Sequence, residues 1–474
     1  MKYEVTIGLE THVELDTASK IFCACGGHSS PKEPNDCVCP ACSGMPGMLP
    51  VMNKRVVEKA VTAGLMLNCE INRYATFDKK NYYYPDLPCA YQITQLFHPI
   101  CVNGKVEVTT KDGVSMIGIK QIHMEEDAGK LVHDEWTDTS LVDFNRTSVP
   151  LIEIVTHPDF HSAEEVLSYL EMLKSMFRFG KISECEEGAM RCDVNISVRP
   201  EGQTELGVRT EIKNMSSFTS IERAIKYETA RHIDALERQT EVLVQETRRW
   251  DDTKGRTFAM RNKETEADYR YFPDPNLMPI VIDDAWLDEI KSAMPKKPEV
   301  KAAEYAEMGI SEKEIEVLTG ERNLCDLLDG VVALGASVKD AVAWILTECA
   351  GVLRKNGQVL SDLQITPEKL AKIIAMVADG KINRGAGKKV LTAVIEKDVD
   401  PEEFARENSL DANTDESAVA AVVDKVLAAD PKSVEDYKNG KTKVFQALFG
   451  ACMRELRGTA DPMVIKKLLE EKLK

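Results

Sequence analysis

Five cysteines lie close together near the start of the 474-residue chain. They form two short-spaced pairs, Cys23-Ala-Cys25 and Cys39-Pro-Ala-Cys42, and Cys37 comes just before the second pair. Two thiolate pairs joined by a polar loop are typical of a structural zinc knuckle. We therefore expect Zn²⁺ on Cys23, Cys25, Cys39 and Cys42, with Cys37 spare or able to replace one of them. The total of 13 cysteines is odd, which disfavours a disulfide framework.

A second zinc chemistry is suggested by His12-Val13-Glu14 upstream of the Cys-x-x-Cys pair. The combination resembles the H-x-E and P-C-x-x-C signature of zinc-dependent nucleobase deaminases. However, Pro40 lies inside the cysteine pair instead of before it. Two additional cysteines also close the site, which leaves no position for an activated water. The deaminase is therefore the weaker alternative.

Polar side chains recur at every second position in several segments that alternate like β-strands. In Tyr3–Leu15, Ile117–Asp127 and Arg191–Arg199, apolar and polar residues point to opposite faces. The polar faces carry Glu10, His12 and Glu14; Gln121, His123, Glu125 and Asp127; Arg191, Asp193, Asn195, Ser197 and Arg199; and, in a fourth segment, Arg209, Glu211 and Lys213. Any one of them could be the solvated face of an antiparallel sheet. Together, these mixed acidic, basic and imidazole groups indicate a site for a hard cation and a phosphate.

The elements that position these residues change in character along the chain. Up to about residue 290 the chain is strand-rich, with two helices, Ala163–Phe179 and Phe218–Leu236. After Pro295, apolar residues recur at helical spacing. We predict an α+β protein with a mainly antiparallel sheet and flanking helices in 1–294, an all-α domain in 295–405 and a small all-α tail domain in 406–474. After residue 295 we expect helical segments at 314–318, 324–334, 338–353 and 367–377. An acidic linker at 398–415 follows. Beyond the linker we expect helices at 416–429, at 434–457 with a candidate break at Gly440, and at 462–473.

The overall charge bears on the partners of the protein. Lysine and arginine total 60 against 78 acidic residues, a net charge of −18, which argues against indiscriminate binding to nucleic acid or anionic membrane. The segment Lys432–Lys474 is the exception, with ten basic and six acidic residues. No apolar run is long enough to span a bilayer, and the first residues carry charges where a signal peptide has its apolar core. We therefore expect a cytoplasmic protein without a membrane partner.

Nine stretches of the chain together resemble one known family. They are IGLETHVEL, CPACSGMPGMLPVMN, FDKKNYYYPDLPCAYQITQ, HMEEDAGK, VDFNRTSVPLIEIVTHPD, EEGAMRCDVNISVR, EIKNMSSF, QETRRWDDTKGRTFAMRNKE and DYRYFPDPNLMP. The chain is similar in these stretches to the B subunits of the tRNA-dependent amidotransferases (GatB). The resemblance is dense from residue 3 to about 280 and looser to the end.

The resemblance implies an enzyme that corrects misacylated tRNA. In this family ATP phosphorylates the side-chain carboxylate of Glu on tRNA(Gln) or of Asp on tRNA(Asn), and ammonia then displaces the phosphate. The ammonia comes from the A subunit, an amidase (glutaminase), which forms a heterotrimer with B and with the small C subunit. The family architecture is a catalytic cradle domain, a helical domain and a tRNA-binding tail domain. Many members lack the zinc cysteines, so zinc here would be structural and dispensable to the chemistry.

The resemblance also implies the residues of the catalytic site. Those that match the metal-lined catalytic cleft of the family are Glu10, His12, Glu125, Glu153, Asp193 and Glu211. We expect Mg²⁺ on Glu10, Glu125 and Glu211 with His12 at the rim. We expect ATP phosphate or substrate contacts from Asn195, Lys213 and Arg248, and Lys79 and Lys80 belong to a motif near the same cleft.

A non-catalytic tRNA-binding adaptor is the alternative from a different functional class. The basic tail favours it, and so does the lack of a standard ATP motif, since Gly385-Ala-Gly387-Lys388 does not complete a P-loop. The adaptor leaves the carboxylate-rich faces unexplained. ATP hydrolysis that depends on tRNA would distinguish the enzyme from the adaptor.

Overall fold

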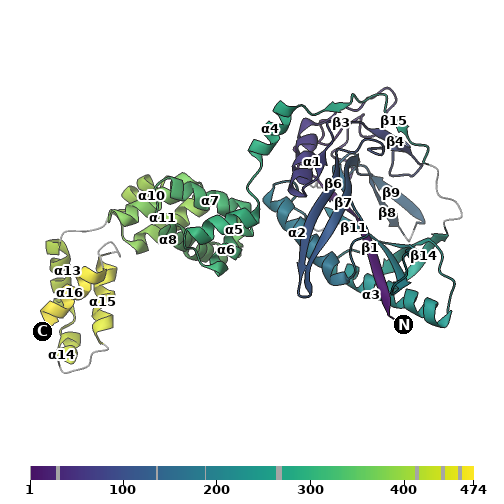
Figure 1. Ribbon diagram of the computed structural model, residues 1–474. Coiled ribbons are helices and arrows are strands. Elements are labelled where there is room, and N and C mark those ends of the chain that lie inside the picture. The colour runs from purple at the N-terminus through teal and green to yellow at the C-terminus, as the bar shows by residue number, and fades with distance from the viewer. Residues whose placement is uncertain are drawn as a thin grey trace. The chain divides into compact units, whose positions relative to one another are not determined.

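The computed structural model describes residues 2–27, 33–134, 137–186, 188–262, 269–410, 416–438, 444–456 and 462–473. The chain forms two compact units, Met1–Lys297 and Pro298–Lys474. The described strands all lie in the first unit, whereas the described elements of the second are helices (Figure 1). This arrangement confirms the predicted α+β class. Among these residues, no helix has both the length and the apolar character needed to cross a membrane.

A nine-stranded sheet forms the centre of the first unit. Its strand order is β14-β13-β12-β11-β1-β10-β7-β6-β2, and every pairing is antiparallel except β12 with β13. The strands are β1 (Tyr3–Glu14), β2 (Glu70–Ile71), β6 (Cys101–Thr110), β7 (Gly113–Glu126), β10 (Pro150–Thr156), β11 (Met190–Pro200), β12 (Thr210–Lys213), β13 (Glu246–Asp251) and β14 (Arg256–Asn262). The first strand of the chain therefore lies in the middle of the sheet, between two strands that come much later in the sequence.

Three smaller sheets complete the strand content of this unit. They are β15-β4-β5, from Phe272–Pro273, Asp78–Asn81 and Tyr91–Thr94; β16-β3, from Ile280–Val281 and Tyr74–Ala75; and β8-β9, from Lys130–Asp134 and Thr139–Asp143. The sheet β15-β4-β5 brings the segment after residue 269 next to the Lys79-Lys80 motif.

Helices pack against one face of the large sheet and form the main core with it (Figure 1). They are α1 (Lys54–Met66), α2 (Ala163–Phe179) and α3 (Phe218–Arg238), followed in the same unit by α4 (Asp284–Ala293). The predicted helix at Ala163 is confirmed, and its capping box joins Ser162 and Glu165. Helix α1 was not predicted; Asn53 caps it, and its residues pack on the sheet. The core leaves the opposite face of the sheet to polar side chains.

The second unit begins with a bundle of short helices. They are α5 (Pro298–Glu307), α6 (Glu312–Thr319), α7 (Arg322–Ala333), α8 (Val338–Ala343), η1 (Trp344–Cys349), α9 (Ala350–Lys355), η2 (Leu360–Asp362), α10 (Pro367–Ala378), α11 (Arg384–Lys397) and α12 (Pro401–Glu407). The predicted helix at 338–353 contains one π-helical turn, η1. Helix α12 lies where we predicted a linker. The acidic sequence there starts a helix because the Asp400 carboxylate accepts hydrogen bonds from two backbone N–H groups, and Pro401 suits the first turn.

Four helices form the end of the chain: α13 (Glu416–Ala429), α14 (Pro431–Lys438), α15 (Val444–Glu455) and α16 (Pro462–Leu473). They share a core of their own, which includes Val423, Leu448, Cys452 and Leu469. The segment predicted at 434–457 forms two helices, and the candidate break at Gly440 lies outside the described residues. The separate core supports our proposal of a tail domain, but the proposed boundary at residue 406 falls inside α12, which packs on α10 and α11.

Candidate functional site

The polar face of the large sheet gathers side chains from strands that are distant in sequence. Opposite one another in the register are Glu10 and Asp193, His12 and Glu153, and Glu153 and His123. Directly opposed residues point to the same face of a sheet. Alternation along each strand therefore places the predicted carboxylates in neighbouring rows, because β1 lies between β10 and β11.

The first group of ligand-type side chains consists of His12, Glu125 and Glu153, whose ligand atoms lie within 4.8 Å of one another. His12 Nε2 is 3.3 Å from Glu125 Oε1 and 3.5 Å from Glu153 Oε2. His123 joins them, with Nε2 2.8 Å from Glu153 Oε2. Burial opposes the charge on His12, but Glu153 and Glu125 raise its pKa to about 9. The imidazole and two largely buried carboxylates therefore form one donor set of nitrogen and oxygen atoms.

The second group consists of Glu10, Asp193 and Glu211, again with ligand atoms within 4.8 Å of one another. Lys213 Nζ lies 2.5 Å from Asp193 Oδ2 and 3.0 Å from Glu211 Oε1. Asn195 donates a hydrogen bond of 3.1 Å to Glu10 Oε1. Burial, together with Glu153 and Glu211, raises the pKa of Glu10. A concentration of acidic groups in which the pKa of a carboxylate is raised is a favourable environment for a divalent cation.

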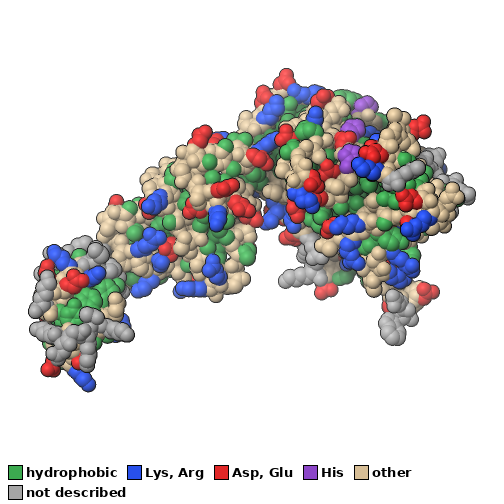
Figure 2. Space-filling view, turned by 60° about the horizontal axis from the view of Figure 1, so that its bottom comes forward, with side chains coloured by type: hydrophobic (Ala, Val, Ile, Leu, Met, Phe, Trp, Pro, Cys, Tyr) green, Lys and Arg blue, Asp and Glu red, His purple; other side chains and the backbone are tan. Residues whose placement is uncertain are grey.

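Two cavities open beside these groups. One, of about 510 Å³, is lined by His12, Glu125, Asp193 and Lys213 and by the aromatic ring of Tyr82. The other, of about 420 Å³, is lined by Glu10, Asn195, Lys120, His157 and Arg209 among others. On the side of the first unit that Figure 2 shows, histidine side chains lie among acidic and basic ones. The site therefore has room for substrate on both sides, with basic groups beside the carboxylates.

Lys79 and Lys80 are adjacent in β4 and point in different directions. Lys80 lies over the ring of Tyr269 at 4.9 Å, and its charge helps to hold down the pKa of Glu125, which burial raises. Lys79 lies over the ring of Tyr91 at 4.0 Å, with Nζ 3.8 Å from the buried Asp274. The structure thus brings Lys80, but not Lys79, towards the His12 group.

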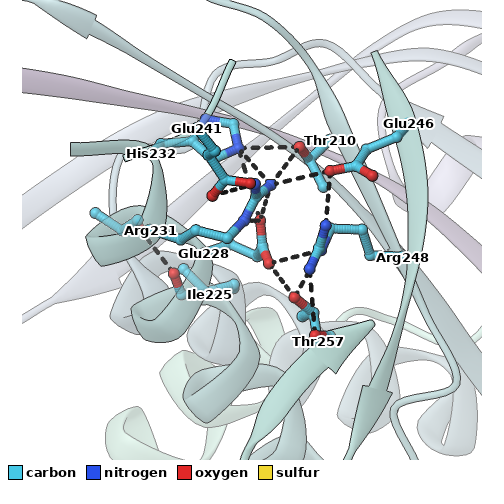
Figure 3. A network of polar contacts seen from close by, with 10 residues as sticks. Thr210, Ile225, Glu228, Arg231, His232, Glu241, Glu246, Arg248 and Thr257 are labelled. Carbon is cyan, nitrogen blue, oxygen red and sulfur yellow. Dashed lines mark hydrogen bonds and ion pairs between the residues drawn. The ribbon is translucent and has the colours of Figure 1, made fainter. Parts of the chain in front are cut away.

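Arg248 lies on the helical side of the sheet, away from the carboxylate groups. Its guanidinium is 2.7 Å from Glu246 Oε1 and 3.3 Å from Glu228 Oε1, and Nε donates to Thr257 Oγ1 at 2.8 Å. Figure 3 shows these side chains turned towards one another beside α3. Only 13% of the Arg248 side chain is exposed. In this structure all its main contacts are internal, so it does not join the cleft residues that we predicted with it.

The predicted zinc ligands converge. The sulfurs of Cys23, Cys25, Cys39 and Cys42 all lie within 4.8 Å of one another. The Sγ of Cys42 is 3.8 Å from that of Cys39 and 4.0 Å from that of Cys25. A tetrahedron with Zn–S bonds of about 2.3 Å has edges of about 3.8 Å, so the spacing fits zinc. The Sγ of Cys37 is instead directed to the carbonyl of Gly26 at 3.6 Å.

Lys20 supports the same cluster. Its side chain is fully buried, and Nζ lies 3.6 Å from Cys42 Sγ and donates to the carbonyl of Cys37 at 2.9 Å. A hydrogen bond from Cys23 and the charge of Lys20 lower the pKa of Cys42 to about 4. His12 groups with carboxylates and not with these sulfurs, so the residues do not form the mixed His and Cys site of a deaminase.

Two residues of the polar face were not assigned a role from the sequence. His123 was placed on that face, but its position against Glu153 depends on the pairing of β7 with β10. Arg249 is opposite Lys213 in the register of β12 and β13, and it is exposed on the polar face of the sheet, opposite to the face on which Arg248 lies. The sequence contains the information that separates Arg248 from Arg249. Arg248 is two residues before Trp250, so the two side chains point to the same face of the strand, and Trp250 is a residue expected in the core.

Comparisons with known proteins agree along the whole chain. Residues 5–288 match the family described as the GatB/GatE catalytic domain, and residues 326–473 match the GatB domain. Relatives named as the B subunit of aspartyl/glutamyl-tRNA(Asn/Gln) amidotransferase include those of Lachnoclostridium phytofermentans, 47% identical over 99% of both chains, and Lachnospira eligens, 48% identical over 100% of this chain and 99% of the relative. The relative from Carboxydothermus hydrogenoformans is 47% identical, with the same coverage as the Lachnospira protein. The chain therefore belongs to the family of B subunits of the tRNA-dependent amidotransferases.

Proposed function

We propose that the polar face of the nine-stranded sheet carries out the phosphorylation and amidation steps of the amidotransferase. The observation that carries this proposal is the pair of acidic groups, His12-Glu125-Glu153 and Glu10-Asp193-Glu211, on one face of one sheet. Hard divalent cations prefer such oxygen-rich donor sets, and phosphoryl transfer from ATP requires them. The donor chemistry of both groups therefore fits Mg²⁺.

The bound cations would supply charge neutralisation for the phosphoryl oxygens. Glu125, Glu153 and His12 would hold one of them, and Glu10, Asp193 and Glu211 the other. The set expected from the sequence is thereby divided, because Glu125 lies with His12 and not with Glu10 and Glu211. Lys213 has its ammonium group between two carboxylates and beside a cavity, from where it can bind a phosphate oxygen. Asn195 orients the Glu10 carboxylate by donating a hydrogen bond to it.

The reaction proceeds in two steps that conserve atoms and charge. A side-chain carboxylate oxygen of the aminoacyl group attacks the γ-phosphorus of ATP, which forms an acyl phosphate and releases ADP. Ammonia then attacks the acyl carbon, the C–O bond to phosphate breaks, and loss of a proton gives the amide. Phosphorylation turns a poor leaving group into a good one. We propose that a glutaminase, the A subunit, supplies the ammonia within a heterotrimer that also contains the small C subunit.

ATP hydrolysis that depends on misacylated tRNA tests this function. The assembled complex should release ADP when Glu-tRNA(Gln) or Asp-tRNA(Asn) is added, and should release little with correctly charged tRNA. ADP release would be measured in a coupled assay with free ammonium as the nitrogen donor. Tight tRNA binding without any ADP release would favour the adaptor.

We expect the tail domain to bind the body of the tRNA. The segment Lys432–Lys474 has ten basic and six acidic residues in an otherwise acidic chain. Ending the chain after Asp415 should weaken tRNA affinity about tenfold or more, because phosphate contacts dominate such binding, and should spare the glutaminase activity of the partner. Filter binding and a glutaminase assay on the same complex would measure both effects. Unchanged tRNA affinity would assign the tail another role.

A further inference from the structure

Three basic side chains surround one aromatic ring where β13 turns into β14. The centre of the Phe258 ring lies 5.6 Å from the guanidinium of Arg249, 5.0 Å from Lys254 Nζ and 4.7 Å from the guanidinium of Arg256. Phe258 is partly exposed and the three basic residues are exposed. We call these four residues the Phe258 platform.

The charge of the Phe258 platform is only partly balanced. Asp251 lies 4.0 Å from Lys254 Nζ. Neither Arg249 nor Arg256 has a carboxylate oxygen within 4.0 Å among the side chains that the structure describes. Three cations that share one ring repel one another, so this arrangement is favoured when an anion binds between them.

The Phe258 platform lies on the same face of the sheet as the carboxylate groups. Arg249 is opposite Lys213 in β12 and opposite Phe258 in β14. Thr247, two residues before Arg249, donates a hydrogen bond of 2.6 Å to Glu211. The two strand spacings from β12 to β14 amount to roughly 10 Å, about the length of three stacked nucleotides.

The substrate chemistry indicates what binds there. The reacting carboxylate belongs to an amino acid esterified to the 3′ end of a tRNA. When that carboxylate reaches Glu10, Asp193 and Glu211, the terminal nucleotide lies beside them, and the other unpaired nucleotides extend from it at about 3.4 Å or more each. An aromatic ring with exposed cations is the usual surface for unpaired nucleotides, since bases stack on the ring and phosphates meet the charges.

We infer that the Phe258 platform binds the single-stranded 3′ end of the substrate tRNA. Phe258 stacks against a base, while Arg249 and Arg256 contact the phosphates on either side. This inference rests on the proposed function, because it takes the carboxylate groups as the place where the aminoacyl group reacts.

A simpler explanation for the basic residues also exists. Strand β14 is an edge of the sheet, and charged side chains at edges prevent strands of different molecules from pairing. Edge protection requires charge, but not an aromatic ring between three cations. It also predicts aggregation of the variants and no change in tRNA binding.

The test compares intact tRNA with tRNA that lacks its four 3′ nucleotides. Binding of each uncharged transcript to the assembled complex would be measured without ATP, so that failure of the phosphorylation chemistry cannot affect the result. The double variant Arg249→Gln/Arg256→Gln and the single variant Phe258→Leu should each weaken binding of intact tRNA about ten- to a hundredfold. Neither should change binding of the trimmed tRNA. The double variant should also reduce the salt dependence of intact tRNA binding by about one to two released ions.

Arg238→Gln is the matched control. Arg238 is 71% exposed at the end of α3, on the opposite side of the sheet, and is paired with Asp234 at 3.6 Å. This change should leave both affinities as they are. Equal losses with intact and trimmed tRNA, or no loss with either, would overturn the inference. Thermal unfolding checks each variant, and the single variant Arg249→Gln replaces the double variant if the latter does not fold.

Discussion

Replacing Glu125 by Gln is expected to lower ATP-dependent amidation about 100-fold or more while tRNA binding stays nearly unchanged. Glu125 is 4% exposed and lies 3.3 Å from His12 and 3.8 Å from His123. The amide has the size of the carboxylate but removes one negative ligand from the proposed cation site. Charge neutralisation is a main contribution to the rate of phosphoryl transfer, so the chemical step should suffer most.

The assay should use free ammonium as the nitrogen donor, because this bypasses the glutaminase and the transfer of ammonia between subunits. Glu107→Gln is the matched control: Glu107 is exposed on β6 of the same sheet. Filter binding of tRNA and thermal unfolding would show that the Glu125 variant is folded and binds substrate. Near-normal amidation by Glu125→Gln would show that Glu125 is not part of the catalytic site. The polar face of β7 would then be an ordinary solvated face of the sheet.

The second large effect is expected from loss of zinc. We expect about one zinc per chain in protein purified without chelator, bound by Cys23, Cys25, Cys39 and Cys42. Structural zinc sites contribute on the order of 10 kcal/mol to local folding. The variant Cys42→Ser should therefore lose the metal and make the segment around residues 20–50 sensitive to proteases, since Cys42 is 3% exposed at the centre of the cluster.

Elemental analysis and limited proteolysis would measure these effects, and Cys37→Ser provides a matched control. The Sγ of Cys37 is directed to a backbone carbonyl and is not one of the four converging sulfurs, so this variant should keep its zinc. Loss of zinc from Cys37→Ser together with retention in Cys42→Ser would show that the ligand set is wrong. Protein without any zinc would contradict the site as a whole.

Several features of the fold could be predicted because they depend on local sequence. The period of two in β1 separated Ile7 and Leu9 from Glu10 and His12. The capping box at Ser162 marked the start of α2. Other elements were missed for local reasons as well: Asp400-Pro401 signals a helix start inside a segment whose composition is typical of a linker.

The sequence by itself therefore determined which residues share a face of a strand and which cysteines are spaced for zinc, because both follow from covalent geometry over a few residues. Only the tertiary structure decided which faces meet. Glu10, Asp193 and Glu211 converge because β1, β11 and β12 are neighbours, a choice made by packing between segments far apart in the sequence. The same non-local pairing directs Arg248 towards Glu228 and places Arg249 on the face that carries Lys213. A shift of one residue reverses the face of every side chain in a strand, so the register had to come from the fold.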